Sequence, residues 1–186
     1  MSGKLAPSTK RSLIGALLQL TWAGLLAIGA SGVLAGAMDS AFGPDFVAGD
    51  FPGVTYTSAR CADLQEYAPP GTSCNRAAAL HHADETVSYR VGAGVLGVLV
   101  FGVWFVTRRR LAGEVGTTSR SLPPGFIATA GLAMFGIVGL ATLASGLGLL
   151  VLGTDTGAGA DLSAAIVSLS VAGAYASKLV RILTGC

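Results

Sequence analysis

Two adjacent histidines followed by two acids are the residues of this chain whose types could do chemistry. His81, His82, Asp84 and Glu85 stand within five consecutive positions. Neutral imidazoles and carboxylates are common ligands of divalent metal ions. If the segment is helical, His81 and Glu85 share one face, because residues i and i+4 are neighbours on a helix. The pattern therefore gives a candidate divalent-metal site with these four residues as ligands.

A solvated helix face with ion pairs explains the same residues without a metal. A closed metal site needs three or four ligands, and further ones would have to come from Asp63, Glu66 or another chain. We prefer the solvated face. Metal binding or metal sensing is kept as an alternative, and a response to pH is another, because histidine titrates near neutrality.

Signatures of the common enzyme classes are missing from the sequence. It contains no C-x-x-C pair, no G-x-S-x-G turn, no H-E-x-x-H helix and no glycine-rich phosphate loop followed by lysine. Haem inside a membrane would need a histidine within an apolar block, and both histidines lie outside them. We assign no catalytic residue, and we expect a non-enzymatic protein with no nucleic-acid partner.

Composition indicates that the chain lies in a lipid bilayer. Of its 186 residues, 52% are hydrophobic and only 12% are charged, and the mean hydropathy is +0.65. A soluble domain would show amphipathic periods, whereas here the apolar residues form long blocks separated by polar segments. Each block is long enough to cross a hydrocarbon layer of about 30 Å. We therefore predict an all-α membrane protein.

We expect a bundle of four transmembrane helices. These cover residues 12–37, 91–107, 125–153 and 162–183. Pro123 and Pro124 suit the start of the third helix, because proline lacks only an N–H that has no partner there. Asp161 is expected to cap the fourth. The connecting segments are the N-terminus 1–11, a long loop 38–90, a basic loop 108–124, a short turn 154–161 and the C-terminus 184–186.

The distribution of lysine and arginine predicts the orientation. Basic residues concentrate in segments 1–11 and 108–124 and at Lys178 and Arg181. Cytoplasmic segments carry such an excess, so both termini and the basic loop are predicted to be cytoplasmic. Segments 38–90 and 154–161 are then outside. The abundance of alanine and glycine and the scarcity of lysine suggest a bacterium, and hence its inner (plasma) membrane.

The first apolar block has a second interpretation. Basic residues, an apolar run and the small residues Ala35, Gly36 and Ala37 also resemble a signal peptide with its cleavage site. The run is much longer than the usual 7 to 15 residues of such a peptide. We therefore prefer an uncleaved first helix.

The outer loop carries the chain's best-defined covalent feature. Cys61 and Cys74 lie on the predicted oxidising side, so a disulfide between them is expected. Closing this short ring is worth about 3 kcal/mol in the chain-entropy model. Asn75 is expected to cap a helix that continues into the second span.

Upstream of the cysteines, aromatic residues alternate with glycine and proline. This stretch is too interrupted for a helix and allows one short strand around residues 54–57. Its aromatics are Phe42, Phe46, Phe51 and Tyr56. An aromatic belt at the membrane interface is preferred over a ligand pocket, because nothing polar converges on them.

Small residues inside the predicted spans indicate close helix packing. Gly32, Gly36, Gly94, Gly97, Gly136 and Gly139 are the glycines concerned, and the fourth span adds Ser163, Ser170 and Ser177 at seven-residue intervals. Small residues let helix backbones approach closely in lipid, so we interpret the serines as a packing seam. A polar file lining a pore is the alternative.

These features favour a non-enzymatic accessory or assembly subunit of a membrane complex. The expected partners are membrane lipid and another membrane protein or a second copy of the chain. A metal-binding protein that uses the histidine cluster is an alternative. A small-solute transporter or pore formed by oligomerisation is another, although no ionisable residue lies in the centre of any span.

Overall fold

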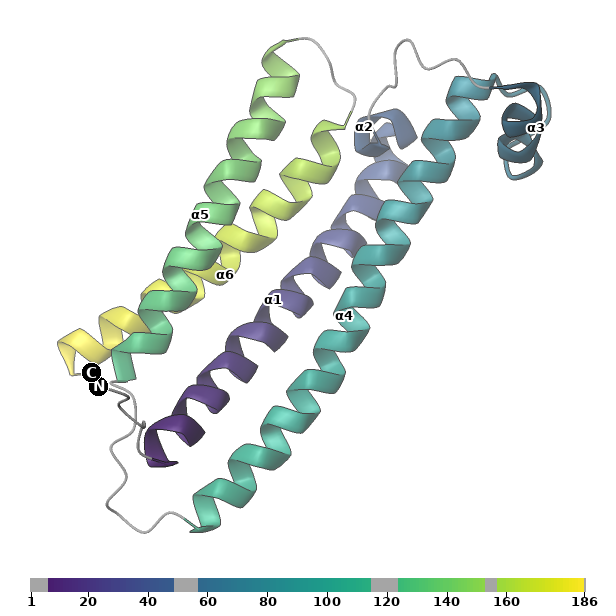
Figure 1. Ribbon diagram of the computed structural model, residues 1–186. Coiled ribbons are helices and arrows are strands. Elements are labelled where there is room, and N and C mark those ends of the chain that lie inside the picture. Colours follow the sequence, from purple (N-terminus) through teal and green to yellow (C-terminus); the bar gives the residue numbers. More distant parts are fainter. Residues whose placement is uncertain (1–6, 49–56, 115–123, 153–156, 186) are drawn as a thin grey trace, which may run out of the picture.

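Six helices make up the part of the chain that the computed structural model describes, residues 7–48, 57–114, 124–152 and 157–185 (Figure 1). They are α1 (Pro7–Phe42), α2 (Pro44–Ala48), α3 (Ser58–Glu66), α4 (Cys74–Glu114), α5 (Pro124–Val151) and α6 (Ala158–Thr184). No strand occurs within these ranges.

Four of the helices are long and apolar enough to cross a membrane. Their candidate spans are Leu13–Phe42, Cys74–Thr107, Gly125–Val151 and Ala158–Thr184. The predicted all-α architecture with four candidate spans is therefore confirmed, and it indicates a multi-pass membrane protein. The predicted segments 12–37, 91–107 and 162–183 fall inside α1, α4 and α6, while α5 ends at Val151, two residues before the predicted 153.

The four long helices form an open row in the order α4, α1, α6, α5 (Figure 1). α1 packs against α4 on one side and α6 on the other, and α5 packs mainly against α6. Within the described residues, no Cα atom of α4 lies within 8 Å of α5 or α6. A closed four-helix bundle would give each helix two neighbours, so α4 and α5 are edge helices here.

Glycines bring the backbones of α1 and α4 into direct contact. A Cβ atom added at Gly29 would lie 2.4 Å from the Cα atom of Gly94, and one added at Gly94 would lie 2.8 Å from the Cα atom of Gly29. Without a side chain at either position the helices gain dispersion contacts along their length. Such contacts drive helix association in lipid, where the hydrophobic effect does not.

A core joins α1 to the hairpin of α5 and α6. Ala23 and Ala27 of α1 pack with Phe135 of α5 and with Ala172 and Tyr175 of α6. The rings of Phe135 and Tyr175 are stacked, with centroids 5.9 Å apart. The two hairpins, α1 with α4 and α5 with α6, thus meet through α1 and α6.

The segment between α1 and α3 differs from its prediction. Residues 44–48 form α2, so the expectation that this stretch is too interrupted for a helix is wrong there. Pro44 suits the first helical position, and Gly43 turns the chain with a φ of +93°, where glycine carries no steric penalty. The predicted strand around 54–57 lies outside the described residues, except for Thr57, which caps α3.

Helix α4 has 41 residues and is therefore about 60 Å long, twice the thickness of a hydrocarbon core. Its start is capped by Ser73, whose Oγ accepts a hydrogen bond from the Arg76 backbone N–H at 3.4 Å, and not by Asn75. Likewise α6 begins after Gly157, which places Asp161 inside its first turn and not at its cap. Both predicted caps are corrected here.

Candidate functional site

The predicted metal cluster lies on the exposed part of α4. His81, His82 and Glu85 share a helix face, and the Oε2 atom of Glu85 is 3.9 Å from Nδ1 of His81 and 3.7 Å from Nδ1 of His82. These distances exceed those of hydrogen bonds. All three side chains are between 42% and 50% exposed, so water solvates them.

The four candidate ligands are not brought together as a metal site. Asp84 is exposed on the same helix, and Asp63 and Glu66, the other possible donors, are exposed on α3. Among the residues that the structure describes, no group of three or more histidine, cysteine, aspartate or glutamate side chains could hold a metal ion. The geometry is that of a solvated face with histidine–glutamate pairs.

A disulfide ties α3 to the start of α4. Cys61 is bonded to Cys74, with their Cα atoms 5.4 Å apart, so the predicted pairing is present. Beside it, Leu64 packs against Ala77 and Ala78. The Gln65 side chain also donates a hydrogen bond to the carbonyl of Thr72 at 2.8 Å. Helix α3 therefore rests on α4 through a covalent link and a small apolar contact.

Sequence analysis missed a polar bridge between α4 and α6. The Nη1 atom of Arg90 donates hydrogen bonds to the carbonyl of Ala160 at 3.0 Å and to Oγ of Ser163 at 3.1 Å. Ser163 is fully buried and itself donates to the Ala160 carbonyl at 2.8 Å. Gly32 of α1 makes room for the arginine, because a Cβ atom there would lie 2.5 Å from Cβ of Arg90.

An acidic residue of α6 completes this polar group. Asp161 lies close enough to interact with the charge of Arg90. Its Oδ2 atom also accepts a short hydrogen bond from Oγ of Ser145 on α5. The group therefore combines side chains from α4, α5 and α6 and connects the two hairpins. The signal in the sequence was an arginine beside an apolar block, but its partner 70 positions later could not be read from spacing.

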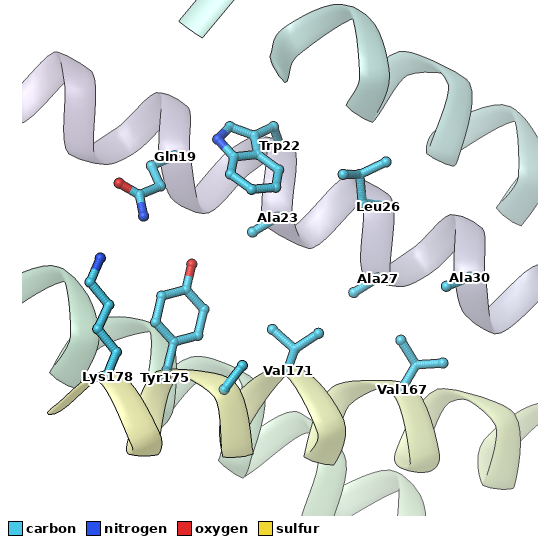
Figure 2. Close-up of a pocket in the computed structure, with 11 residues that line it drawn as sticks. Gln19, Trp22, Ala23, Leu26, Ala27, Ala30, Val167, Val171, Tyr175 and Lys178 are labelled. Carbon is cyan, nitrogen blue, oxygen red and sulfur yellow. The ribbon is translucent and has the colours of Figure 1, made fainter. Parts of the chain in front are cut away.

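Away from this bridge, a groove runs along one side of the contact between α1 and α6 (Figures 1 and 2). It has a volume of about 490 Å³. The α1 side is lined by Gln19, Trp22, Ala23, Leu26, Ala27 and Ala30, and the α6 side by Val167, Val171, Ala174, Tyr175 and Lys178. The lining is apolar except near one end, where Gln19, Tyr175 and Lys178 gather (Figure 2).

No known protein family, curated protein or solved structure matches this chain. Its function is therefore argued from the geometry of these sites.

The predicted packing glycines differ in what they contact. Gly32, Gly94, Gly97 and Gly139 lie against a neighbouring helix closely enough that a Cβ atom would meet an atom at 2.9 Å or less. A Cβ atom added at Gly36 would lie at an ordinary 3.5 Å from a side-chain methyl group of Val87.

Not every small residue of the prediction lies in an interface. A Cβ atom at Gly136 would meet no described atom within 4 Å. Of the three serines only Ser163 is buried. Ser170 and Ser177 are exposed and donate to carbonyls of their own helix, at 2.7 Å to Ile166 and 2.9 Å to Gly173. Of the three serines in the predicted packing seam, only Ser163 therefore contacts a neighbouring helix.

Proposed function

We propose that this chain is a non-enzymatic accessory or assembly subunit that completes a membrane complex or homo-oligomer through its edge helices. The observation that carries the proposal is the open row. Within the described residues, the backbone of α4 packs against α1, and α4 reaches α6 through the Arg90 side chain, while α5 packs mainly against α6. Each edge helix thus has a long apolar side that no other described spanning helix covers.

Glycines on these unoccupied sides support the proposal. A Cβ atom added at Gly92 or Gly102 of α4, or at Gly136 or Gly148 of α5, would meet no described atom within 4 Å. Glycine inside a helix costs up to about 1 kcal/mol relative to alanine, so these positions destabilise the isolated chain. In membranes, small residues permit close approach of a second helix, and a partner at these sides would use them.

The proposed setting is a bacterial inner membrane with both termini in the cytoplasm. Lys178, Arg181 and Arg109 lie towards the end of the row where α1 begins and α6 ends, which we call the terminal end (Figure 1). The guanidinium of Arg109 lies 4.4 Å from the ring centroid of Phe105. Cationic and aromatic side chains of this kind anchor helix ends at the cytoplasmic interface.

The test is purification of the tagged chain from its native membrane in mild detergent, with mass spectrometry of what accompanies it. We expect a stoichiometric membrane partner or a defined oligomer. Gly102→Leu and Gly136→Leu should lower recovery of the partner by about tenfold, the effect of losing one well-packed contact. Their fold should survive, because both positions face open space.

A matched variant separates loss of a partner from loss of the fold. A Cβ atom at Gly139 would lie 2.8 Å from the Leu169 side chain, so Gly139→Leu should disturb the α5–α6 contact itself. A strictly monomeric chain that brings no partner from its membrane would refute the proposal.

The two other functions that the sequence suggested have less support. The hydroxyls of Ser170 and Ser177 are satisfied by their own helix, as is common in lipid, and need no pore. The histidine cluster is part of no group of three metal-ligating side chains within the described residues. We therefore put forward neither a transporter nor a metal protein.

A further inference from the structure

We propose that the groove between α1 and α6 binds an anionic phospholipid, with one acyl chain between the helices and its phosphate at Lys178. This site goes beyond an assembly role, because it concerns a small ligand on a different surface from the edge helices. The walls are almost entirely alkyl and aromatic, and the polar lining residues gather near one end (Figure 2).

The dimensions of the groove match one lipid chain. Its α6 wall runs from Val167 to Lys178, which is about 17 Å at the rise of an α-helix. One leaflet contributes about 15 Å of hydrocarbon, half of the core thickness. The volume of about 490 Å³ is typical of a small-molecule site. A gap of this size left empty would forfeit the dispersion contacts of its walls, so a chain of matching length stabilises it.

The position of the groove along the membrane fits a lipid of the basic side. Lys178 lies about 27 Å along α6 from Ala160, where Arg90 binds near the opposite end of the row. This spacing is close to the core thickness and puts the ammonium group at headgroup depth. The groove then extends from one headgroup layer to about the middle of the bilayer.

The positive charge at the polar end of the groove favours a lipid with an anionic headgroup. Lys178 is exposed at the polar end, and the groove lining contains no acidic residue. Basic residues between transmembrane helices on the cytoplasmic side attract anionic headgroups. The side chain of Gln19 and the hydroxyl of Tyr175 lie at the same end of the groove (Figure 2).

A buried indole donor lies beside the polar end of the groove. The indole Nε1 of Trp22, a groove-lining residue, is buried and has no hydrogen-bond partner among the described residues. A buried donor without an acceptor costs free energy. Figure 2 shows the indole nitrogen on the side of Gln19, near the polar end.

Native mass spectrometry of the full chain in mild detergent, with added phosphatidylglycerol or phosphatidylcholine, tests the site. We expect retention of phosphatidylglycerol in preference to phosphatidylcholine. Lys178→Gln should weaken phosphatidylglycerol binding about fivefold, the effect of one basic residue at a membrane surface. Arg109→Gln removes a charge from the same end but outside the groove, and should leave binding unchanged. Ala174→Phe should abolish retention by filling the groove.

A spectroscopic measurement needs no groove variant and therefore does not depend on how such variants fold. In a Trp104→Phe chain, Trp22 is the only remaining tryptophan. Its fluorescence should be quenched saturably by phosphatidylglycerol brominated on the acyl chains, and unlabelled phosphatidylglycerol should reverse this, whereas inorganic phosphate should not. Non-saturable quenching, equal retention of both lipids, or equal binding by the two charge variants would overturn the proposal. The proposal would also be overturned if the Ala174→Phe variant bound lipid normally but changed its oligomeric state. In that case a second copy of the chain, and not a lipid, would occupy the groove.

Discussion

Arg90 of α4 and Ser163 of α6 are hydrogen-bonded at 3.1 Å, although their helices are separated by α1. The contact is possible because Gly32 has no side chain under the arginine stem. A long arginine can cover apolar surface with its alkyl part while its charged head reaches polar partners. The bridge joins the two hairpins at the end of the row that lies opposite the terminal end. The α1–α6 groove does not reach this end.

Arg90→Ala should therefore destabilise the fold and loosen the two hairpins. Hydrogen bonds from charged groups contribute about 1.5–3 kcal/mol, and buried Ser163 would lose a partner as well. We expect a loss of this size in the free energy of unfolding, measured by denaturant titration in detergent. Arg60→Ala on exposed α3 is the control and should have little effect. Equal stabilities of the two variants would show that the bridge contributes nothing.

The contact of Gly29 with Gly94 predicts a contrast between two neighbouring glycines. Gly94→Ala places a methyl group 2.8 Å from the Cα atom of Gly29, so α1 and α4 must separate, at about 1–3 kcal/mol. Gly92→Ala faces open space, so it should be neutral or stabilise by up to about 1 kcal/mol through helix propensity. Thermal unfolding monitored by circular dichroism would check this. A Gly94→Ala chain as stable as Gly92→Ala would contradict the close approach.

Removal of the disulfide should release α3 and leave the spans in place. Apart from the Cys61–Cys74 bond, α3 is held by the small cluster of Leu64 with Ala77 and Ala78 and by the hydrogen bond from Gln65 to the Thr72 carbonyl. The link is worth about 3 kcal/mol in the chain-entropy model. In the Cys61→Ser, Cys74→Ser chain, hydrogen exchange should accelerate throughout residues 58–66 and stay unchanged in α5. Unchanged protection of α3 would mean that its non-covalent contacts suffice to hold it.

The sequence predicted the number of spans and the disulfide because each rests on local or compositional information. Apolar blocks give spans, and two cysteines in one polar loop leave a single pairing within it. The order of the helices was not accessible, since a residue that faces lipid and one that faces another helix are equally apolar. Gly136 and Gly139 illustrate this, as they lie one turn apart and only Gly139 contacts a neighbour.

Two features escaped the sequence analysis for reasons that lie in the tertiary structure. Residues 44–48 form a helix despite flanking glycine and proline, because α2 packs among α1, α4 and α6. Phe46 of α2 lies close against Gly159 of α6. A Cβ atom added at Gly159 would be only 2.5 Å from the Cδ1 atom of Phe46. The acceptors of Arg90 depend on how the two hairpins meet. Neither contact has a signature in the local sequence.

The Arg90 bridge also determines when the molecule can be completed during synthesis. Its acceptor at Ala160 is 70 residues further along the chain, and ribosomes add about 5–20 residues per second. For about 4 to 14 seconds the newly made α1–α4 hairpin therefore carries a guanidinium without its partners on α6. A nascent chain interrupted in that interval would leave the Arg90 guanidinium without its α6 acceptors, which distinguishes it from the finished protein.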